Sequence, residues 1–477
     1  MKLNIFLLIV SFFLTIEVGY AQCNQGDVVT FQKTFGGTTN ERAHSIQSTL
    51  DGGYIVVGET TSFGAGGKDW FVMKLDANGN QQWTKTIGGS GDDDGFSITI
   101  KQTSDLGYII SGSTNSFGAG SFDDSYLIKL SSIGNIVWEK RITGGSWDRL
   151  RDVVELVNGD FLFTGSAGSF SNGNMDVHLV KISPTGNLIW INNLGTSVRE
   201  HSQSLLELPG GNYITSGNTN VTDTRNAFLI KTDNNGQPIW SKEYGVNSKQ
   251  DDFNETILLN DGNLLNVGWT KPNDYNIWLM KSDTNGNVIW NRTYGGSGDD
   301  IGVNVREKSN GELVISSFTD SYGNGKEMLL INTDNLGGVI WSKTYGGIGN
   351  DEMESWGKPM ALSGVDEIII AGGTYSYGVG GEDIYIVKTN ECGESYCNEQ
   401  DVVLTLTSPN INGVDFSISS VTGGTLVATN STVNSINFTE VFLCIDSNTI
   451  SVACDLTANF FNTSFCFGDS TYFNDLS

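Results

Sequence analysis

A unit of about 50 residues repeats along most of the chain, and this repeat restricts the fold more than any other feature. Six tryptophans, each shortly after a glycine-containing turn, recur at intervals of 55, 52, 50, 50 and 51 residues. A second column, mostly lysines, recurs seven times, so we count seven copies of the unit. The tryptophan column is Trp83, Trp138, Trp190, Trp240, Trp290 and Trp341, with Phe31 in the equivalent place before them, and the second column is Lys74, Lys129, Lys181, Lys231, Lys281, Asn332 and Lys388.

Each copy has the pattern of four short β-strands. In the copy from 84 to 138, strands are expected at 96–103, 108–113 and 126–130, and the fourth strand, 136–142, contains the tryptophan. Short β-branched and aromatic runs between glycine turns are typical of antiparallel hairpins. Seven such units predict an all-β protein with a seven-bladed β-propeller over residues 22–396. A straight solenoid is the alternative.

Closure of the ring favours the propeller. A lone strand at 28–35 precedes the first complete set of three strands, and it could complete the last blade and remove an exposed edge. The segment 394–403 is the alternative fourth strand of that blade. We expect each tryptophan ring to pack between adjacent blades; exposed rings that serve as ligand platforms are the alternative.

The N-terminus has the features of a secretory signal. Residues 1–21 combine Lys2, an apolar run over 5–14 and a small-x-small cleavage site at 19–21. A lipid anchor on Cys23 is the alternative, although the residues before it match a lipobox poorly. Later segments contain no apolar stretch long enough for a membrane helix. We therefore expect a secreted or cell-surface protein, monomeric as a propeller, whose cysteines can be oxidised.

All cysteines lie outside the interval 24–391. The six are Cys23, Cys392, Cys397, Cys444, Cys454 and Cys466. If the N-terminal strand closes the ring, Cys23 and Cys392 lie at the same end of one blade, which predicts a Cys23–Cys392 disulfide; a local Cys392–Cys397 pair is the alternative. Residues 397–455 are expected to form a small β module or spacer, with strands at 402–406, 414–418, 424–428 and 439–443, in which Cys444 and Cys454 could join a hairpin.

A column of carboxylates follows the glycine-rich loops between blades. Its members are Glu41, Asp93, Glu200, Asp252, Asp300 and Asp351, with Arg149 in the remaining repeat. A ring of carboxylates could bind Ca²⁺ through hard oxygen ligands. The competing interpretation is that each acid caps backbone N–H groups beside its turn.

A second column consists of aromatic residues in the loops after the second strand of each unit. These are Phe63, Phe117, Phe170, Tyr322 and Tyr377, each preceded by a serine. Longer loops gather on one face of a propeller, where ligands commonly bind. The rings could stack on sugars or peptides there, or they could fill the grooves between blades.

Charge and residue usage exclude several functions. Lys+Arg number 27 and Asp+Glu 54, which gives a net charge of −27 and argues against a nucleic-acid partner. The three histidines, His44, His178 and His201, fall in different repeats and cannot form a zinc cluster. A Gly-x-Ser-x-Gly elbow is absent from the sequence. A carboxylate pair for glycoside hydrolysis stays open.

The repeat phrases Gly107-Tyr-Ile-Ile-Ser-Gly112, Leu127-Ile-Lys-Leu130 and Gly134-Asn-Ile-Val-Trp138 resemble those of secreted bacterial propellers of the delta-60, SBBP or quinoprotein-like type. The resemblance covers about residues 28–390 and implies the fold, but not one activity. The segments Ala458-Asn-Phe-Phe and Cys466-Phe-Gly-Asp-Ser-Thr-Tyr-Phe-Asn-Asp-Leu-Ser477 look like the start of an immunoglobulin-like PKD domain, incomplete at 456–477. This layout resembles proteins of the type IX secretion route.

These observations lead to two functional hypotheses. The first is an exported, non-enzymatic propeller that binds a glycan, a peptide or a surface protein as a binding or adhesion module, with no cofactor other than a possible calcium ion. The alternative is an extracellular carbohydrate-active enzyme, a hydrolase or lyase, with a carboxylate site in the propeller channel.

Overall fold

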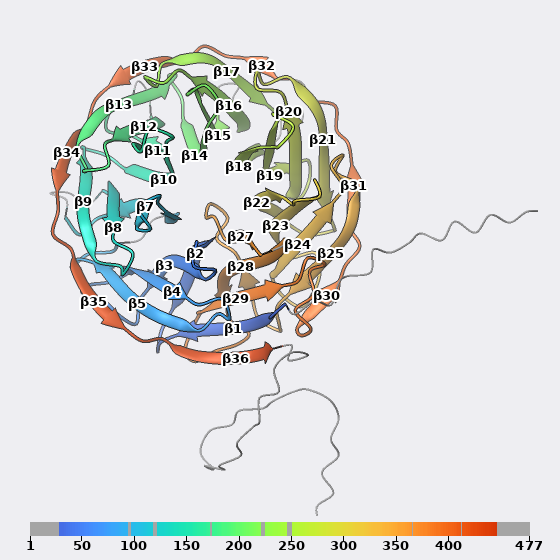
Figure 1. Cartoon of the computed structure of the whole chain (residues 1–477). Coiled ribbons are helices and arrows are strands. Elements are labelled where there is room, and N and C mark those ends of the chain that lie inside the picture. The colour runs from blue at the N-terminus through green and yellow to red at the C-terminus, as the bar shows by residue number, and fades with distance from the viewer. Residues whose placement is uncertain are drawn as a thin grey trace, which may run out of the picture.

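The computed structural model describes residues 28–445, except 94–96, 118–121, 172–173, 221–224, 246–249, 365 and 412. All regular elements in these residues are β-strands, and they form seven antiparallel sheets around a central axis (Figure 1). The seven-bladed β-propeller is therefore confirmed, and the straight solenoid is excluded.

Blades 1 to 6 each have four strands, which follow one another in chain order from the axis outward (Figure 1). Blades 1 to 3 consist of β2 (Glu41–Ser48), β3 (Tyr54–Thr60), β4 (Asp69–Leu75), β5 (Gln81–Gly88); β6 (Thr99–Gln102), β7 (Tyr108–Thr114), β8 (Asp124–Leu130), β9 (Ile136–Thr143); and β10 (Asp148–Glu155), β11 (Phe161–Ala167), β12 (Asp176–Ile182), β13 (Leu188–Gly195). Blades 4 to 6 consist of β14 (Glu200–Glu207), β15 (Tyr213–Thr219), β16 (Asn226–Thr232), β17 (Pro238–Tyr244); β18 (Gln250–Leu258), β19 (Leu264–Lys271), β20 (Asn276–Ser282), β21 (Val288–Gly295); and β22 (Asp300–Glu307), β23 (Leu313–Thr319), β24 (Glu327–Thr333), β25 (Val339–Tyr345).

Blade 7 joins the two ends of the repeat region. Its inner strand is interrupted and consists of β26 (Asp351–Glu352) and β27 (Met360–Ser363), followed by β28 (Glu367–Thr374) and β29 (Asp383–Thr389). Its fourth strand is the N-terminal β1 (Phe31–Gly36), which pairs with β29 in the register Phe31↔Lys388. The predicted closure by the N-terminal strand is confirmed. The alternative closure by 394–403 is wrong, because β30 (Glu399–Asp401) pairs with β25 of blade 6.

The segment after blade 7 encircles the whole propeller (Figure 1). It adds a fifth, outermost strand to every blade, in the order blade 6, 5, 4, 3, 2, 1 and 7. We call residues 397–445 the belt; its strands are β30, β31 (Thr405–Thr407), β32 (Val414–Asp415), β33 (Ser419–Thr422), β34 (Thr425–Ala428), β35 (Thr432–Ile436) and β36 (Thr439–Ile445).

The belt replaces the small β module that we expected over 397–455. Strands do lie within the ranges 402–406, 414–418, 424–428 and 439–443, but they pair with the blades and not with one another. The physical reason is that each four-stranded blade leaves an outer edge of unpaired N–H and C=O groups. A chain segment that runs around the ring satisfies all seven edges in turn, and no local sequence pattern reveals such distant partners.

A disulfide between Cys397 and Cys444 closes the belt. Both cysteines lie beside Gln32 of β1: its Nε2 donates to the Cys397 carbonyl oxygen, and its backbone pairs with Cys444. The belt thus completes one turn around the propeller and forms a covalent hoop. The Cys444–Cys454 and Cys392–Cys397 pairs are wrong. Cys392 is also disulfide-bonded, to a partner outside the described residues.

Buried contacts hold the belt against the blades. Lys33 of β1, which is fully buried, forms an ion pair of 2.9 Å with Glu440 of the belt, and its Nζ lies 4.0 Å from the centre of the Phe442 ring. Phe438 packs edge-on against Phe71, with ring centroids 5.3 Å apart. These contacts join the belt to the hydrophobic core between blades 7 and 1.

The tryptophan column packs between adjacent blades, as predicted. The ring of Trp190 in blade 3 lies under Gly236, in the outer turn of blade 4, where a Cβ would come within 2.7 Å of the ring. Gly236 also has φ +74°, a conformation that glycine adopts without strain. The same pairing of a tryptophan with the next blade's glycine recurs around the ring, for example between Trp341 and Gly393.

Candidate functional site

A loop of blade 7 fills the central channel. The inner strand β2 of blade 1 is continuous over 8 residues, but residues 353–359 of blade 7 separate β26 from β27 and project toward the axis (Figure 1). The Trp356 carbonyl oxygen accepts a hydrogen bond of 2.5 Å from Ser97 Oγ in blade 2. The Lys358 N–H donates to the His44 carbonyl oxygen of blade 1 over 2.9 Å, and its Nζ to the Asn254 carbonyl oxygen of blade 5 over 2.9 Å. We call this loop the plug.

The acidic column caps the loops between blades. Asp300 is fully buried, and its carboxylate accepts hydrogen bonds from the Gly296 N–H at 2.7 Å and from Ser321 Oγ at 2.8 Å, and a further one from Thr319 Oγ1. Asp93, Glu200 and Asp351 make equivalent contacts. These carboxylates hold the chain in place where it passes from one blade to the next.

At two places in the acidic column, the residue that we expected there from the sequence is the one that follows the capping residue. By register, blades 3 and 5 contribute Asp148 and Asp251, not Arg149 and Asp252. Asp148 and Asp251 are fully buried, and burial raises the pKa of Asp148 to about 6. Sequence spacing did not separate them because two polar residues stand side by side at both sites.

The column does not gather around a metal ion. Within the described part of the chain, no three His, Cys, Asp or Glu side chains come together as metal ligands. Each capping carboxylate belongs to a different blade, and its oxygens accept hydrogen bonds from its own loop. This arrangement supports the capping interpretation, and we propose no calcium site.

The five aromatic residues of the second column are half-buried in packing contacts. Phe63 packs against Phe438 of the belt with centroids 5.7 Å apart, and Tyr322 donates to the Val403 carbonyl oxygen of the belt over 2.8 Å. The others lie in the grooves between blades; they are Phe117, Phe170 and Tyr377. The contacts favour the groove-filling interpretation.

A ring of unlike residues surrounds the channel on the side of the capped loops. Each member directly follows the acidic column residue of its inner strand, and its cross-strand partner is at the equivalent register position in each blade. We call these residues the mouth ring; they are Arg42, Arg149, His201, Asp252, Ile301 and Glu352. The equivalent place in blade 2 lies outside the described residues. The plug begins directly after Glu352 of this ring.

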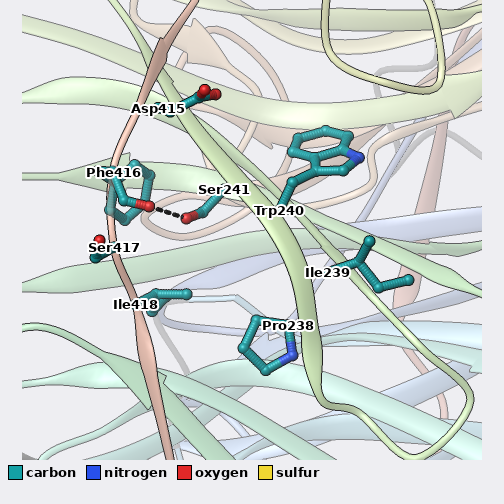
Figure 2. Close-up of a pocket in the computed structure, with 8 residues that line it drawn as sticks. All are labelled: Pro238, Ile239, Trp240, Ser241, Asp415, Phe416, Ser417 and Ile418. Carbon is teal, nitrogen blue, oxygen red and sulfur yellow. Dashed lines mark hydrogen bonds between the residues drawn. The ribbon is translucent and has the colours of Figure 1, made fainter.

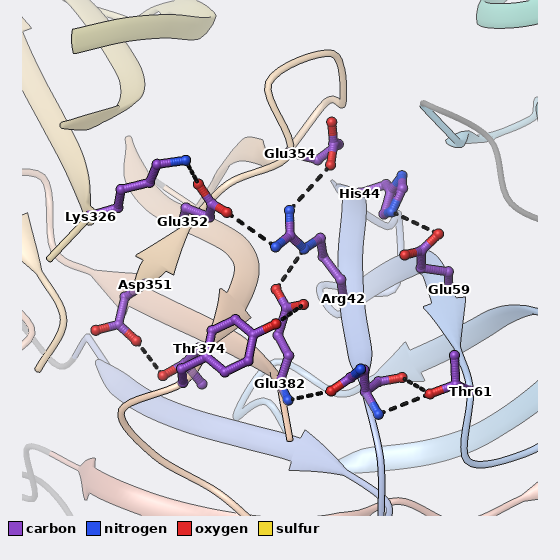
Figure 3. A network of polar contacts seen from close by, with 12 residues as sticks. Arg42, His44, Glu59, Thr61, Lys326, Asp351, Glu352, Glu354, Thr374 and Glu382 are labelled. Carbon is purple, nitrogen blue, oxygen red and sulfur yellow. Dashed lines mark hydrogen bonds and ion pairs between the residues drawn. The ribbon is translucent and has the colours of Figure 1, made fainter. Parts of the chain in front are cut away.

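The mouth ring has an acidic side on blades 7 and 1 (Figure 3). Arg42 forms ion pairs with Glu382 at 2.6 Å, Glu352 at 3.2 Å and Glu354 of the plug at 3.5 Å. Burial and the neighbouring charges of Glu59 and Glu352 raise the pKa of Glu354 to about 7, although Arg42 acts in the opposite direction. Three carboxylates thus surround Arg42, and Lys326 forms a further ion pair of 2.6 Å with Glu352.

The opposite side of the mouth is basic. Arg149 pairs with Asp123, with 2.8 Å between Nε and Oδ2, and Arg225 pairs with Asp252 while its guanidinium lies 4.8 Å from the Trp269 ring. We call Arg149, Arg151, Arg199, His201 and Arg225 the basic sector. Burial and the charges of the four arginines lower the pKa of His201 to about 2, so all four charges act on this imidazole.

Two aromatic rings are exposed beside the basic sector. Phe122 and Trp147 contact each other edge-on at 5.0 Å, with exposed fractions of 39% and 45%. They belong to the loops that carry Asp123 and Asp148, next to Arg149. Most other tryptophans of the propeller are buried or half-buried, so this pair offers an accessible aromatic surface at the mouth.

A separate groove lies at the outer edge of blade 4, where the belt crosses from β32 to β33 (Figure 2). Pro238, Ile239 and Trp240 line one side, and residues 415–418 of the belt line the other. Ser241 Oγ donates to the Phe416 carbonyl oxygen across it. The groove is an open contact between blade and belt, and it lies away from the mouth ring.

Comparisons with known proteins add little about activity. No protein family and no curated protein matches the sequence. Among solved structures, an ulvan lyase, a polysaccharide lyase, matches with 10% identity and a TM-score of 0.44, covering 76% of this chain and 97% of that one. An α-L-arabinanase from Penicillium chrysogenum matches with 10% identity and a TM-score of 0.42 (76% and 98%). A protein of unknown function from Dyadobacter fermentans matches with 9% identity and a TM-score of 0.40 (76% and 100%). Likenesses of this degree say nothing about activity.

The residues of the mouth could not be predicted from repeated columns of similar residues, because they differ between the copies. Arg151, Trp147 and Glu354 are each absent from the equivalent places of other copies, and so they belonged to no column. They could have been found by looking for inner-strand positions at which the seven otherwise similar copies differ.

The described part of the chain has no helix of the length and hydropathy needed to cross a membrane.

Proposed function

We propose that this chain is an exported, non-enzymatic propeller that binds its ligand at the mouth ring, as a binding or adhesion module for a glycan, a peptide or a surface protein. The observation that carries the proposal is the contrast between two neighbouring positions of the same strand. The capping position is an acid in all seven blades, whereas the next position is Arg, Arg, His, Asp, Ile or Glu in the six described blades.

This contrast separates the scaffold from the site. A residue that builds each blade recurs in every blade, since each blade needs the same contact. A ligand off a seven-fold axis meets different blades with different groups, so its site requires differences at equivalent places. The mouth ring has these differences, together with charges of both signs and an exposed aromatic pair.

The test is a binding screen of the secreted full chain against glycan and protein arrays. Ligands that bind are then measured with His201→Ala and Glu352→Gln in the mouth ring. Lys140→Gln on the outer strand β9 is the matched control. We expect both ring variants to weaken binding at least tenfold and the control to leave it unchanged. Binding that neither ring variant alters would refute a site at the mouth.

Export is supported by the disulfide chemistry. Disulfides such as Cys397–Cys444 form in oxidising compartments. The signal at 1–21 lies outside the described residues, and N-terminal mass spectrometry of the secreted protein tests it. The predicted Cys23–Cys392 pair also awaits non-reducing peptide mapping. The proposal also includes a monomeric state and export by a type IX secretion route. It includes repeats of the delta-60-like type and a PKD-like segment at 456–477.

One observation favours an enzyme as the second candidate. Glu354 is only 16% exposed and has a pKa of about 7, and it lies in the mouth within the field of the Glu352 carboxylate. A carboxyl whose pKa is raised toward neutral pH, beside a second carboxyl, is the arrangement of a general acid. Incubation of each bound glycan with the protein, followed by assay for new reducing or unsaturated ends, tests this. Product that disappears with Glu354→Gln would establish a glycan hydrolase or lyase.

A further inference from the structure

The basic sector concentrates positive charge in a strongly acidic protein. The charges of four of the eight arginines of the chain act on His201, although the net charge is −27. Within the described residues, Arg149 forms an ion pair with Asp123 and Arg225 with Asp252. Like charges repel one another, so four guanidinium groups would not gather by chance at one end of a channel unless the site uses their charge.

Arg151 is the strongest sign that an anion is bound. Its side chain is only 5% exposed and rises from the inner strand β10 at the level of the plug. Among the described residues no carboxylate pairs with it, and its Nε has no hydrogen-bond partner. The Trp356 ring packs against it, with its centroid 5.3 Å from the guanidinium carbon.

Burial and the charges of Arg149 and Arg225 lower the pKa of Arg151 to about 10, although the charges of Asp252 and Glu354 act in the opposite direction. A buried cation that no carboxylate contacts is costly, because the lost hydration is not replaced. Arg199 adds to this excess, since it is exposed on the loop before β14 and its Nη2 contacts the sulfur of Met175 at 3.8 Å, with no carboxylate paired to it among the described residues. A planar guanidinium binds carboxylate or sulfate oxygens through two parallel hydrogen bonds, so a ligand that carries such groups would provide the missing partner.

The neighbouring aromatic pair indicates which anion. Phe122 and Trp147 expose their rings beside Arg149, and sugar rings present C–H faces that pack on aromatic faces. A sugar acid or a sulfated sugar places its charged group only a few ångströms from such a face. The carboxylates of blades 7 and 1 face the basic sector across the mouth, and they would repel the same ligand and confine it to one side.

We propose that the basic sector binds an acidic polysaccharide, with ring-borne carboxylate or sulfate groups on Arg151 and Arg199 and a sugar ring on the Phe122–Trp147 pair. This inference rests on the proposed function, which places the binding site at the mouth, and it names the ligand class. Carboxylate and sulfate share the chemistry that the arginines recognise, and the probes below distinguish them.

The test measures binding of the secreted full chain to four probes at low and high salt. Oligogalacturonate presents carboxylates on sugar rings, dextran sulfate presents sulfates, dextran is neutral, and poly-glutamate is an anion without sugar. We expect one of the two acidic glycans to bind, with weaker binding at high salt, and dextran not to bind. Poly-glutamate should bind at least tenfold more weakly than the better glycan.

Three variants locate the site. Arg199→Gln is exposed and has no ion pair, so the fold should tolerate it; Arg151→Gln and Trp147→Ala complete the set. Each should weaken binding of the acidic glycan about tenfold, as expected for the loss of a charged hydrogen bond or a stacking surface. Arg292→Gln, on the outer strand β21, removes the same charge far from the mouth and should change binding less than twofold.

The possible failures can be told apart. Equal binding of poly-glutamate and glycan, unchanged by Trp147→Ala, would overturn the saccharide and indicate an acidic peptide. Equal losses in Arg292→Gln and Arg199→Gln would overturn the site and indicate general attraction. If only a neutral glycan or a protein binds, and the ring variants His201→Ala and Glu352→Gln weaken it, the inference fails and the proposed function stands. Binding that no mouth variant alters refutes both.

Discussion

Opening the hoop should loosen the outer layer of the propeller before it affects the blades. The double variant Cys397→Ser, Cys444→Ser removes the disulfide without leaving a free thiol. The two cysteines are 47 residues apart. The chain-entropy relation for a loop of this length gives about 4 kcal/mol of lost stability at 25 °C. Because the unfolding entropy of a domain of this size is about 0.8–0.9 kcal/mol per degree, the melting temperature should fall by about 5 °C.

The more specific effect concerns the way the belt detaches. In the closed hoop, residues 397–444 cannot unwind from one end, so the strands from β30 to β36 must leave the blades together. In the open form β36 can detach alone and the belt can then peel blade by blade. Hydrogen exchange should therefore speed up at the amides of β30–β36, whereas amides of the inner strands such as β11 exchange at their earlier rates.

A cleaved form of the belt distinguishes the effect of the closed hoop from the effect of a disulfide that only joins two neighbouring strands. A protease site inserted after the exposed Asn430, between β34 and β35, opens the loop but keeps the Cys397–Cys444 bond. If closure around the ring matters, cleavage should raise belt exchange as much as the double variant does. Belt exchange that stays slow in both forms would refute the reasoning, because it would mean that strand pairing alone holds the belt.

Three further predictions test the scaffold. Gly286→Ala and Gly262→Ala both place a side chain at positive φ (+75° and +82°), but only the Gly286 Cβ would meet neighbouring atoms, within 2.6 Å. Calorimetry should therefore show that the free energy of unfolding falls by about 1 kcal/mol for Gly262→Ala and by about 2–4 kcal/mol for Gly286→Ala. Equal losses would contradict packing between blades. Burial and the Asp351 charge raise the pKa of Glu327 to about 8, so its contribution to stability is full below pH 4.5 and is lost as pH rises through 8; the melting temperature should fall between pH 6 and 9, and Glu327→Gln should flatten this decline. Asp300→Ala removes a capping carboxylate and should lower the free energy of unfolding in urea by about 2–3 kcal/mol. Asp299→Ala loses one backbone hydrogen bond of 3.1 Å and should lower it by less than about 1 kcal/mol. Millimolar calcium should change the stability of neither the wild type nor the variants.

Features that form within one blade, or between neighbouring blades, could be predicted from the sequence. Strand periodicity, glycine turns and the tryptophan column depend on neighbours within one or two copies, and these predictions were confirmed, including closure by β1. Partners that the chain reaches only after a full turn of the ring left no local pattern. The strands of the belt were therefore expected, but their pairing with β5, β9 and the other outer strands was not.

The mouth illustrates the same limit in another form. Arg151 and Glu354 are more than 200 residues apart in the sequence, and the plug that brings Glu354 to the axis depends on the interruption between β26 and β27 in blade 7. A one-residue ambiguity, Asp148 beside Arg149, was enough to hide that one side chain caps a loop and the next belongs to the ring. Register, which the cross-strand pairs fix, resolves it.

The belt also determines where partners can bind. An open propeller would offer seven outer edges, and a bare strand edge recruits other chains by pairing with them. Here each edge already pairs with a belt strand, and the belt strands themselves are mostly two to five residues long, too short for a continuous new edge. Partners that dock by strand addition are thus disfavoured around the rim. Recognition then depends on side chains of the two faces, and the face with the mouth ring is where equivalent positions of the seven blades carry unlike charges.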